Sequence, residues 1–87
     1  MPRISFFRGI AILMFSNEAH HSLAHFHARY AEHQAVFGLD GQLIAGSLPR
    51  PQLRAVREWA SLHQTELAHD WGLVQAGERG DPIDPLP

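Results

Sequence analysis

The chain lacks cysteine and lysine altogether, and it has no long hydrophobic run. The absence of cysteine excludes a disulfide framework and a zinc site built on thiolates. Because there is no lysine, the strong side-chain cations are all arginines, whose planar guanidinium suits phosphate and carboxylate groups. The longest apolar run, residues 9–15, has the length of a strand, whereas about 20 residues are needed to cross a bilayer. Since the start also lacks a secretory cleavage pattern, we expect a cytoplasmic protein without a membrane partner.

The length and charge of the chain set further limits. Its 87 residues are enough for one domain. A content of 45% hydrophobic and 18% charged residues indicates a globular fold. Residues 1–60 hold six arginines against four acidic residues, whereas residues 61–87 hold one arginine against five. Partial protonation of the histidines near neutral pH would make the first part distinctly basic.

The pattern of apolar residues predicts an antiparallel sheet in the first half of the chain. Strands are expected at residues 9–15, 25–30, 32–39 and 42–45, with residues 3–7 as a short edge segment before them. The pair Asp40-Gly41 favours a hairpin, because glycine readily supplies the positive φ that a tight turn needs. Four strands joined in sequence make a meander.

A helix is expected in the second half. Pro49 and Pro51 lie where the start of a helix tolerates proline. Apolar residues then recur every three or four positions from Leu53 to Val74. No proline or glycine interrupts residues 52–71, so we predict one long helix rather than two.

These elements combine into one domain of two layers. The expected fold class is α+β, with a four-stranded antiparallel meander packed against one long C-terminal helix, over residues 1–77. Residues 78–87 contain three prolines and two aspartates, and we expect them to form a flexible tail.

A histidine cluster marks the expected functional region. Four of the seven histidines lie within residues 20–27. Side chains alternate between the two faces of an extended strand, so His25, His27 and Arg29 would share one face. The residues between and after them would lie on the other face and pack on the core. The basic face is therefore the candidate site.

Several blocks of the sequence are similar to one known family. They are Gly9-Ile10, Met14-Phe15, His25-Phe26-His27-Ala28 with Tyr30, Gly46-Ser47-Leu48-Pro49, Glu66-Leu67, and Trp59, His63 and Trp71 of the expected helix. Over about residues 2–77, the chain resembles a small prokaryotic family catalogued as domain of unknown function four-one-six-zero.

The chain departs from that family's pattern in the loop before the histidines. Family members typically read Asp-His-x-Pro-Pro there, whereas this chain has His20 at the aspartate position and Leu23-Ala24 at the two prolines. The loop thereby loses rigidity and a carboxylate partner for an imidazole. The resemblance implies a bacterial toxin–antitoxin-like pair of genes. This chain would be the toxin-like member, and a small protein encoded nearby would be its partner.

The histidines themselves suggest a metal site. His25 and His27 would lie about 6.5–7 Å apart on one strand face, close enough for both imidazoles to reach one ion. His21, from the preceding loop, is the candidate third ligand, with His20 as an alternative, and Glu18 or Glu32 could add a carboxylate. Such a set suits a transition metal such as zinc, with one position left open for water.

Cleavage of RNA is a second hypothesis. Two histidines can serve as general base and general acid, and an arginine can stabilise the phosphorane charge, so His25, His27 and Arg29 are the candidate catalytic residues. The candidate binding residues flank this strand or cluster near the expected helix start: His21, Tyr30, Arg50, Arg54 and Arg57. The hypothesis predicts ribonuclease activity.

Two interpretations without catalysis stay open. In one, the exposed sheet edge and the region of Phe6 and Phe7 dock the neighbouring gene product. In the other, the chain is a simple metal-binding domain. Association into a homo-oligomer is compatible with both.

Overall fold

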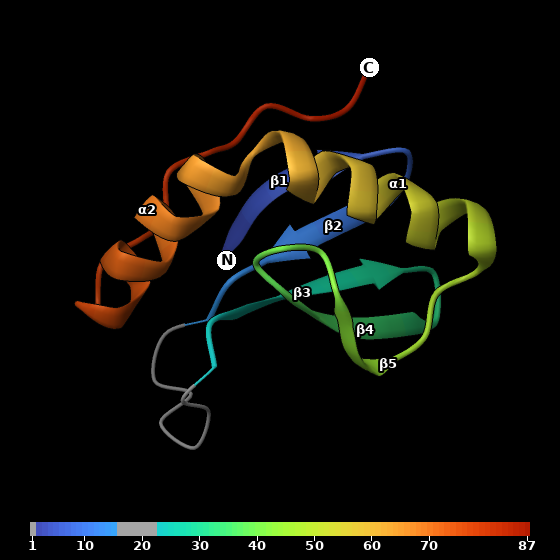
Figure 1. Cartoon of the computed structure of the whole chain (residues 1–87), viewed down its shortest axis with the longest axis horizontal. Coiled ribbons are helices and arrows are strands. Elements are labelled where there is room, and N and C mark those ends of the chain that lie inside the picture. Colours follow the sequence, from blue (N-terminus) through green and yellow to red (C-terminus); the bar gives the residue numbers. More distant parts are fainter. Residues whose placement is uncertain (1, 16–22) are drawn as a thin grey trace.

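A computed structural model of the chain describes residues 2–15 and 23–87. In it, two consecutive helices lie on one side of a five-stranded antiparallel sheet (Figure 1). In chain order the elements are β1 (Arg3–Phe7), β2 (Ile10–Leu13), β3 (His25–Tyr30), β4 (His33–Gly38), β5 (Leu43–Gly46), α1 (Arg50–Leu62) and α2 (Gln64–Gln75). The strands pair in sequence order, so the α+β class and the antiparallel meander are confirmed.

The first strand makes the sheet larger than predicted. Residues 3–7 are more than an edge segment, because β1 pairs with β2 along its length. A two-residue turn joins the two strands at Arg8 and Gly9, whose φ angles are 51° and 79°. Positive φ at both central residues matches the twist of the flanking strands. The prediction of four strands is therefore wrong, since this turn brings residues 3–7 into the sheet.

The helical region is divided at His63. This residue has φ −125° and ψ 34°, outside the helical range, and its N–H donates to the carbonyl of Ala60 at 3.2 Å. The side chain of Gln64 stabilises the break, since its Nε2 donates to the carbonyls of Ala60 at 2.8 Å and Leu39 at 2.6 Å. The prediction of one long helix is therefore wrong: side-chain hydrogen bonds to the backbone mark the break, without glycine or proline. Within the described residues, neither helix has the length and apolarity that a membrane span requires.

The predicted turn and helix-start signals are confirmed. Gly41 has a φ of 90° in the hairpin between β4 and β5, where the N–H of Gly38 donates to the carbonyl of Gln42 at 2.8 Å. Pro51 lies in the first turn of α1, where its missing N–H costs no hydrogen bond.

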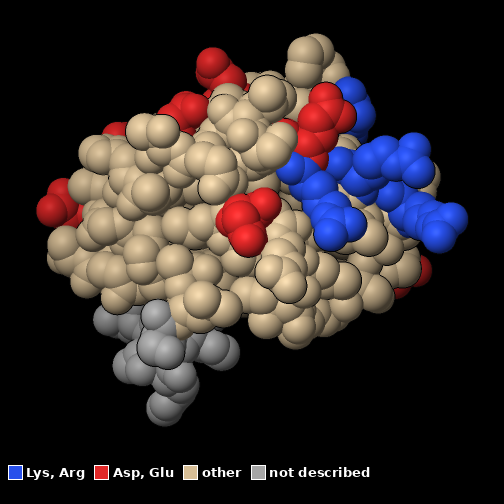
Figure 2. Space-filling view, in the orientation of Figure 1, with Lys and Arg blue, Asp and Glu red and all other residues tan. Residues whose placement is uncertain are grey.

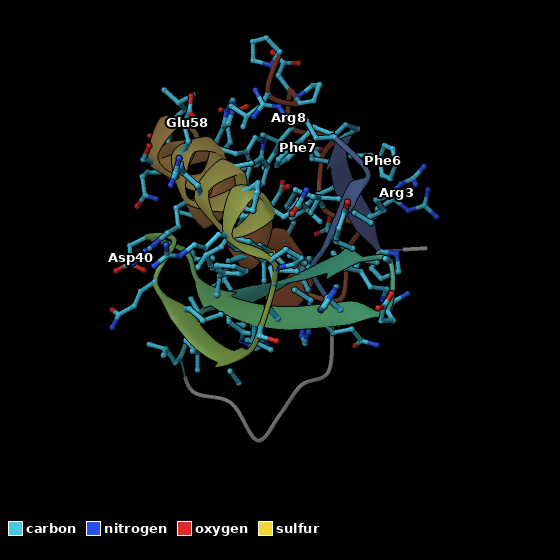
Figure 3. All side chains as sticks on the ribbon, turned by 90° about the vertical axis from the view of Figure 1, so that its right-hand side faces the viewer. Arg3, Phe6, Phe7, Arg8, Asp40 and Glu58 are labelled. Atoms are coloured by element: carbon cyan, nitrogen blue, oxygen red, sulfur yellow. The ribbon has the colours of Figure 1, made fainter. Side chains whose placement is uncertain are left out.

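Trp59 of α1 lies at the centre of the core and is fully buried. Its ring centroid lies 5.5 Å from that of Phe7 and 5.7 Å from that of Phe26. Figure 3 shows Phe7 turned towards α1, and Phe6 and Arg3 on the outer side of β1. There the Arg3 guanidinium lies 5.1 Å from the centre of the Phe6 ring. Of the two phenylalanines expected to dock a partner, Phe7 is thus part of the core.

Residues 78–87 run as an extended segment beside β1. The N–H of Ile83 donates to the carbonyl of Ile4 at 2.8 Å, and the Ser5 hydroxyl donates to the carbonyl of Ile83 at 2.9 Å. The side chains of Ile83 and Leu86 are buried. The segment expected as a tail therefore occupies part of the β1 edge and contributes apolar side chains to the core.

Candidate functional site

β3 presents the predicted histidines on one face. Phe26 and Ala28 are fully buried and face the core, whereas His27 is half-buried and Arg29 is exposed. Tyr30, at the end of the strand, is half-buried and packs against the core cluster. The strand and its alternating burial are therefore as predicted for these residues.

His25 is less accessible than the sequence suggests. Only 3% of its surface is exposed. The centroid of its ring lies 5.3 Å from that of Trp71 on α2 and 5.2 Å from that of His27. The burial follows from the turn of α2 at the helix break, which alternation along β3 cannot reveal.

The Nδ1 atom of His25 lies 2.9 Å from the backbone oxygen of Leu23. A carbonyl oxygen only accepts hydrogen bonds, so Nδ1 carries the proton. In the neutral ring, Nε2 is then the unprotonated nitrogen, the one that can act as a base or as a metal ligand. This hydrogen bond sets both the tautomer and the orientation of the ring.

Apolar side chains wall the histidine pair, by which we mean His25 and His27. Phe15 meets the His27 ring edge-on, with 4.9 Å between centroids. Leu13, opposite His27 in the β2–β3 ladder, is 2% exposed. Together with Trp71, these residues restrict water around the pair and limit the movement of both rings.

The predicted third ligand, His21, lies outside the described residues, and so do His20 and Glu18. The described residues that flank this gap are Phe15 and Leu23. Phe15 contacts the His27 ring, and Leu23 accepts the hydrogen bond from His25. Phe15 and Leu23, the described residues on either side of residues 16–22, thus both lie beside the histidine pair.

The predicted arginines form a separate group. Arg50, Arg54 and Arg57 are exposed on α1 and line a surface hollow with Leu53. In Figure 2 the basic side chains gather on the side of the molecule where α1 begins. β3 begins at the opposite side, next to α2 (Figure 1). The structure therefore brings the three arginines together, and the two histidines together, at different ends of the domain.

Arg29 belongs to neither group. It lies four residues after His25 on the same strand, so the two Cα atoms are about 13 Å apart at the usual rise of a strand. The three residues expected to form one catalytic set thus share a face, but Arg29 lies towards the opposite end of β3 from His25.

Comparison with known proteins identifies the family. The family model described as Domain of unknown function (DUF4160) matches residues 9–72, which is most of the chain. The chain belongs to the DUF4160 family. The matched range contains β3 and Trp71, and thus the histidine pair and its aromatic wall. No curated protein and no solved structure matches the chain.

One polar residue of this DUF4160 domain was missed by sequence reasoning. Asp70 on α2 is a charged residue, yet only 1% of its surface is exposed. Burial raises the pKa of its carboxyl above the usual value, and the negative charges of Asp81 and Glu66 raise it further. The position of Asp70 in the helix indicates its burial, because it follows the buried Leu67 by three residues and precedes the buried Val74 by four, and so lies on the same face.

Proposed function

We propose that this DUF4160 domain is the toxin-like member of a bacterial two-gene module, and that its activity depends on a transition metal held by His25 and His27. Zinc is the ion that a set of neutral imidazoles suits well. The two-gene context comes from the family resemblance. The metal comes from one observation, the 2.9 Å contact between Nδ1 of His25 and the backbone oxygen of Leu23.

This contact is typical of a metal-ligating histidine. Such a histidine usually donates its second ring N–H to a backbone carbonyl or a carboxylate, which fixes the tautomer and makes the ligating nitrogen more basic. In His25 the carbonyl of Leu23 takes this role, so Nε2 is the ligating atom.

The spacing of the two rings supports the same conclusion. A zinc ion about 2.0–2.1 Å from an imidazole nitrogen lies about 3.2 Å from the ring centre, so two ligating rings at a tetrahedral angle have centres about 5 Å apart. The ring centres of His25 and His27 are 5.2 Å apart. The third ligand expected from the sequence is His21.

The alternative in which both histidines act directly as acid and base has less support. A general acid or base must reach the reacting atoms, and His25 is buried beneath Trp71. A bound metal would instead supply Lewis-acid and hydrolytic chemistry at the edge of the pair. RNA remains the proposed substrate class, because Arg50, Arg54 and Arg57 offer exposed guanidinium groups that suit phosphate.

Zinc titration of the untagged protein by calorimetry tests the metal. We expect His27→Ala to weaken the site by at least tenfold. His33→Ala is the matched control, because His33 is also a half-buried histidine on a strand. Equal zinc affinity in the two variants would contradict the proposal.

Growth and RNA integrity test the role in the module. Expression of the chain alone should inhibit growth and degrade RNA, and co-expression of the neighbouring gene should relieve both effects. His27→Ala should abolish the inhibition, while His33→Ala should retain it. Growth inhibition that survives His27→Ala would show that the histidine pair is not the active part.

A protein-docking role is the second candidate, and β5 is the observation that favours it. This strand forms one edge of the sheet, pairs with β4 alone among the strands that the structure describes, and has no fully buried residue. Ile44 is 46% exposed on it. An exposed edge can accept a strand from a partner. Ile44→Lys should then prevent co-purification with the neighbouring gene product and leave zinc binding unchanged.

A further inference from the structure

A second group of metal-ligating atoms lies away from the histidine pair, where α2 meets the C-terminal segment. It consists of His69 and Asp70 from α2 and Asp81 from the segment. One ligand atom from each residue can be chosen so that all three lie within 4.8 Å of one another. Nε2 of His69 and Oδ2 of Asp81 are 3.3 Å apart, so in the absence of an ion the two side chains can form a hydrogen bond. Two residues of the group are exposed, so the group is open to solvent on one side.

The carboxylate of Asp70 is the unusual member of this group. Its Oδ1 accepts the backbone N–H of Asp81 at 2.8 Å. Its Oδ2 is buried and has no hydrogen-bond partner among the described residues. A buried polar atom without a partner costs free energy, so such atoms are rare in folded proteins.

The backbone near Asp81 is shaped around this carboxylate. At Gly80, a Cβ atom would lie 3.2 Å from both Cγ and Oδ2 of Asp70 and 3.1 Å from the side chain of Ile4. Glycine therefore allows the chain to pass close over the carboxylate and to bring Asp81 next to it. A ligand between Asp70 and Asp81 would be held by a rigid helix and by a segment that packs on β1.

We propose that His69, Asp70 and Asp81 bind a divalent cation of the zinc or manganese class, which links the C-terminal segment to α2. One imidazole nitrogen and two carboxylates form a mixed donor set of the kind these ions accept. Ligand atoms about 2.1 Å from one ion lie about 3.0–3.4 Å from each other, and the His69–Asp81 distance falls in this range. The cation would also give Oδ2 of Asp70 its missing partner.

Charge favours a cation at this place. Residues 61–87 carry five acidic side chains and one arginine. Glu66, on the preceding turn of α2, lines the same surface hollow as His69 and Asp81. A divalent cation would offset the repulsion among these carboxylates. The site is distinct from the histidine pair, shares no residue with it, and would be occupied independently.

The test compares Asp81→Asn with Asp84→Asn. Both are exposed aspartates of the same segment, but only Asp81 belongs to the group. Both substitutions are made in protein that carries His27→Ala, which removes the first proposed site. Zinc and manganese binding are then measured by calorimetry, and the melting temperature with and without the ion.

The expected result is one bound ion in the Asp84→Asn protein, with a higher melting temperature when the ion is present. Asp81→Asn should bind at least tenfold more weakly and lose most of the thermal shift, and His69→Gln should behave in the same way. Equal binding by the Asp81→Asn and Asp84→Asn proteins, or no binding by either, would overturn the proposal. In the second case an ordered water is the partner of Oδ2. None of these outcomes bears on the metal site proposed at the histidine pair, so the two metal proposals are tested separately.

Discussion

The burial of Leu86 gives a direct measure of how firmly residues 78–87 pack on the domain. Leu86 is 5% exposed, whereas Leu62, at the end of α1, is 63% exposed. The same substitution, leucine to alanine, therefore tests a buried and an exposed site. A buried leucine replaced by alanine costs about 2–5 kcal/mol. We expect the lower end, about 2–3 kcal/mol, because residues near the end of the segment can partly close the cavity.

Urea unfolding gives the free energy of unfolding of both variants, and thermal unfolding gives their melting temperatures; both are followed by tryptophan fluorescence. Trp59 is fully buried and donates a hydrogen bond to the carbonyl of Asp84 at 2.8 Å, so it reports on the segment as well as on the core. Leu86→Ala should lower the melting temperature by roughly 10–20 °C, at about 4–8 °C per kcal/mol for a domain of this size. Leu62→Ala should change the stability by less than about 0.5 kcal/mol. A Leu86→Ala protein as stable as wild type would refute the packing of the segment.

Three further substitutions should change the stability of the fold in different ways. Gly72→Ala in α2 should stabilise the protein by about 0.5–1 kcal/mol, since a Cβ there meets nothing within 4 Å and alanine favours helix. Gly46→Ala should prevent folding or lower the melting temperature severely, because its Cβ would clash with the backbone of Gln34 and its φ is +76°; circular dichroism distinguishes both cases from wild type. Burial raises the pKa of Asp70, so the folded state holds a proton that the unfolded state has already lost above about pH 3.8. In the presence of a chelator, the free energy of unfolding should therefore fall as the pH rises from about 3.8 through the raised pKa. Asp70→Asn should lack this contribution in denaturant titrations at a series of pH values, and identical pH profiles for the two proteins would contradict it.

Much of the sheet could be predicted because its strands obey a simple alternation. Phe26 and Ala28 are buried as the two-residue period of a strand requires. The chain also turns at Asp40-Gly41, the pair that predicted a hairpin. The turn at Arg8 and Gly9 was harder to recognise, because the apolar residues after Gly9 read as one continuous strand. The helix break was harder still, since it depends in part on a hydrogen bond from the side chain of Gln64 to the carbonyl of Leu39, which is 25 residues away in sequence.

Some features of the candidate site could likewise be predicted from the sequence, and others could not. The histidine pair follows from strand alternation, and the arginine group follows from helix periodicity. The burial of His25 does not, because it depends on Trp71, which α2 brings across from a distant part of the chain. The packing of residues 78–87 on the domain was not predicted, for a different reason. Proline-rich composition predicts the absence of helix and strand, but Ile83 and Leu86 supply enough apolar surface to hold an extended segment in place.

Imidazole nitrogen-15 spectra recorded during a zinc titration test the central claim most directly, because they report each ring nitrogen separately. Before zinc is added, Nδ1 of His25 should be protonated, as the contact with Leu23 requires, so that Nε2 is the unprotonated nitrogen of the neutral ring. Zinc should then shift Nε2 of His25 and one ring nitrogen of His27 together, with matching saturation. Signals of both rings that stay unchanged at saturating zinc, or a protonated Nε2 in His25, would contradict a metal site at this pair.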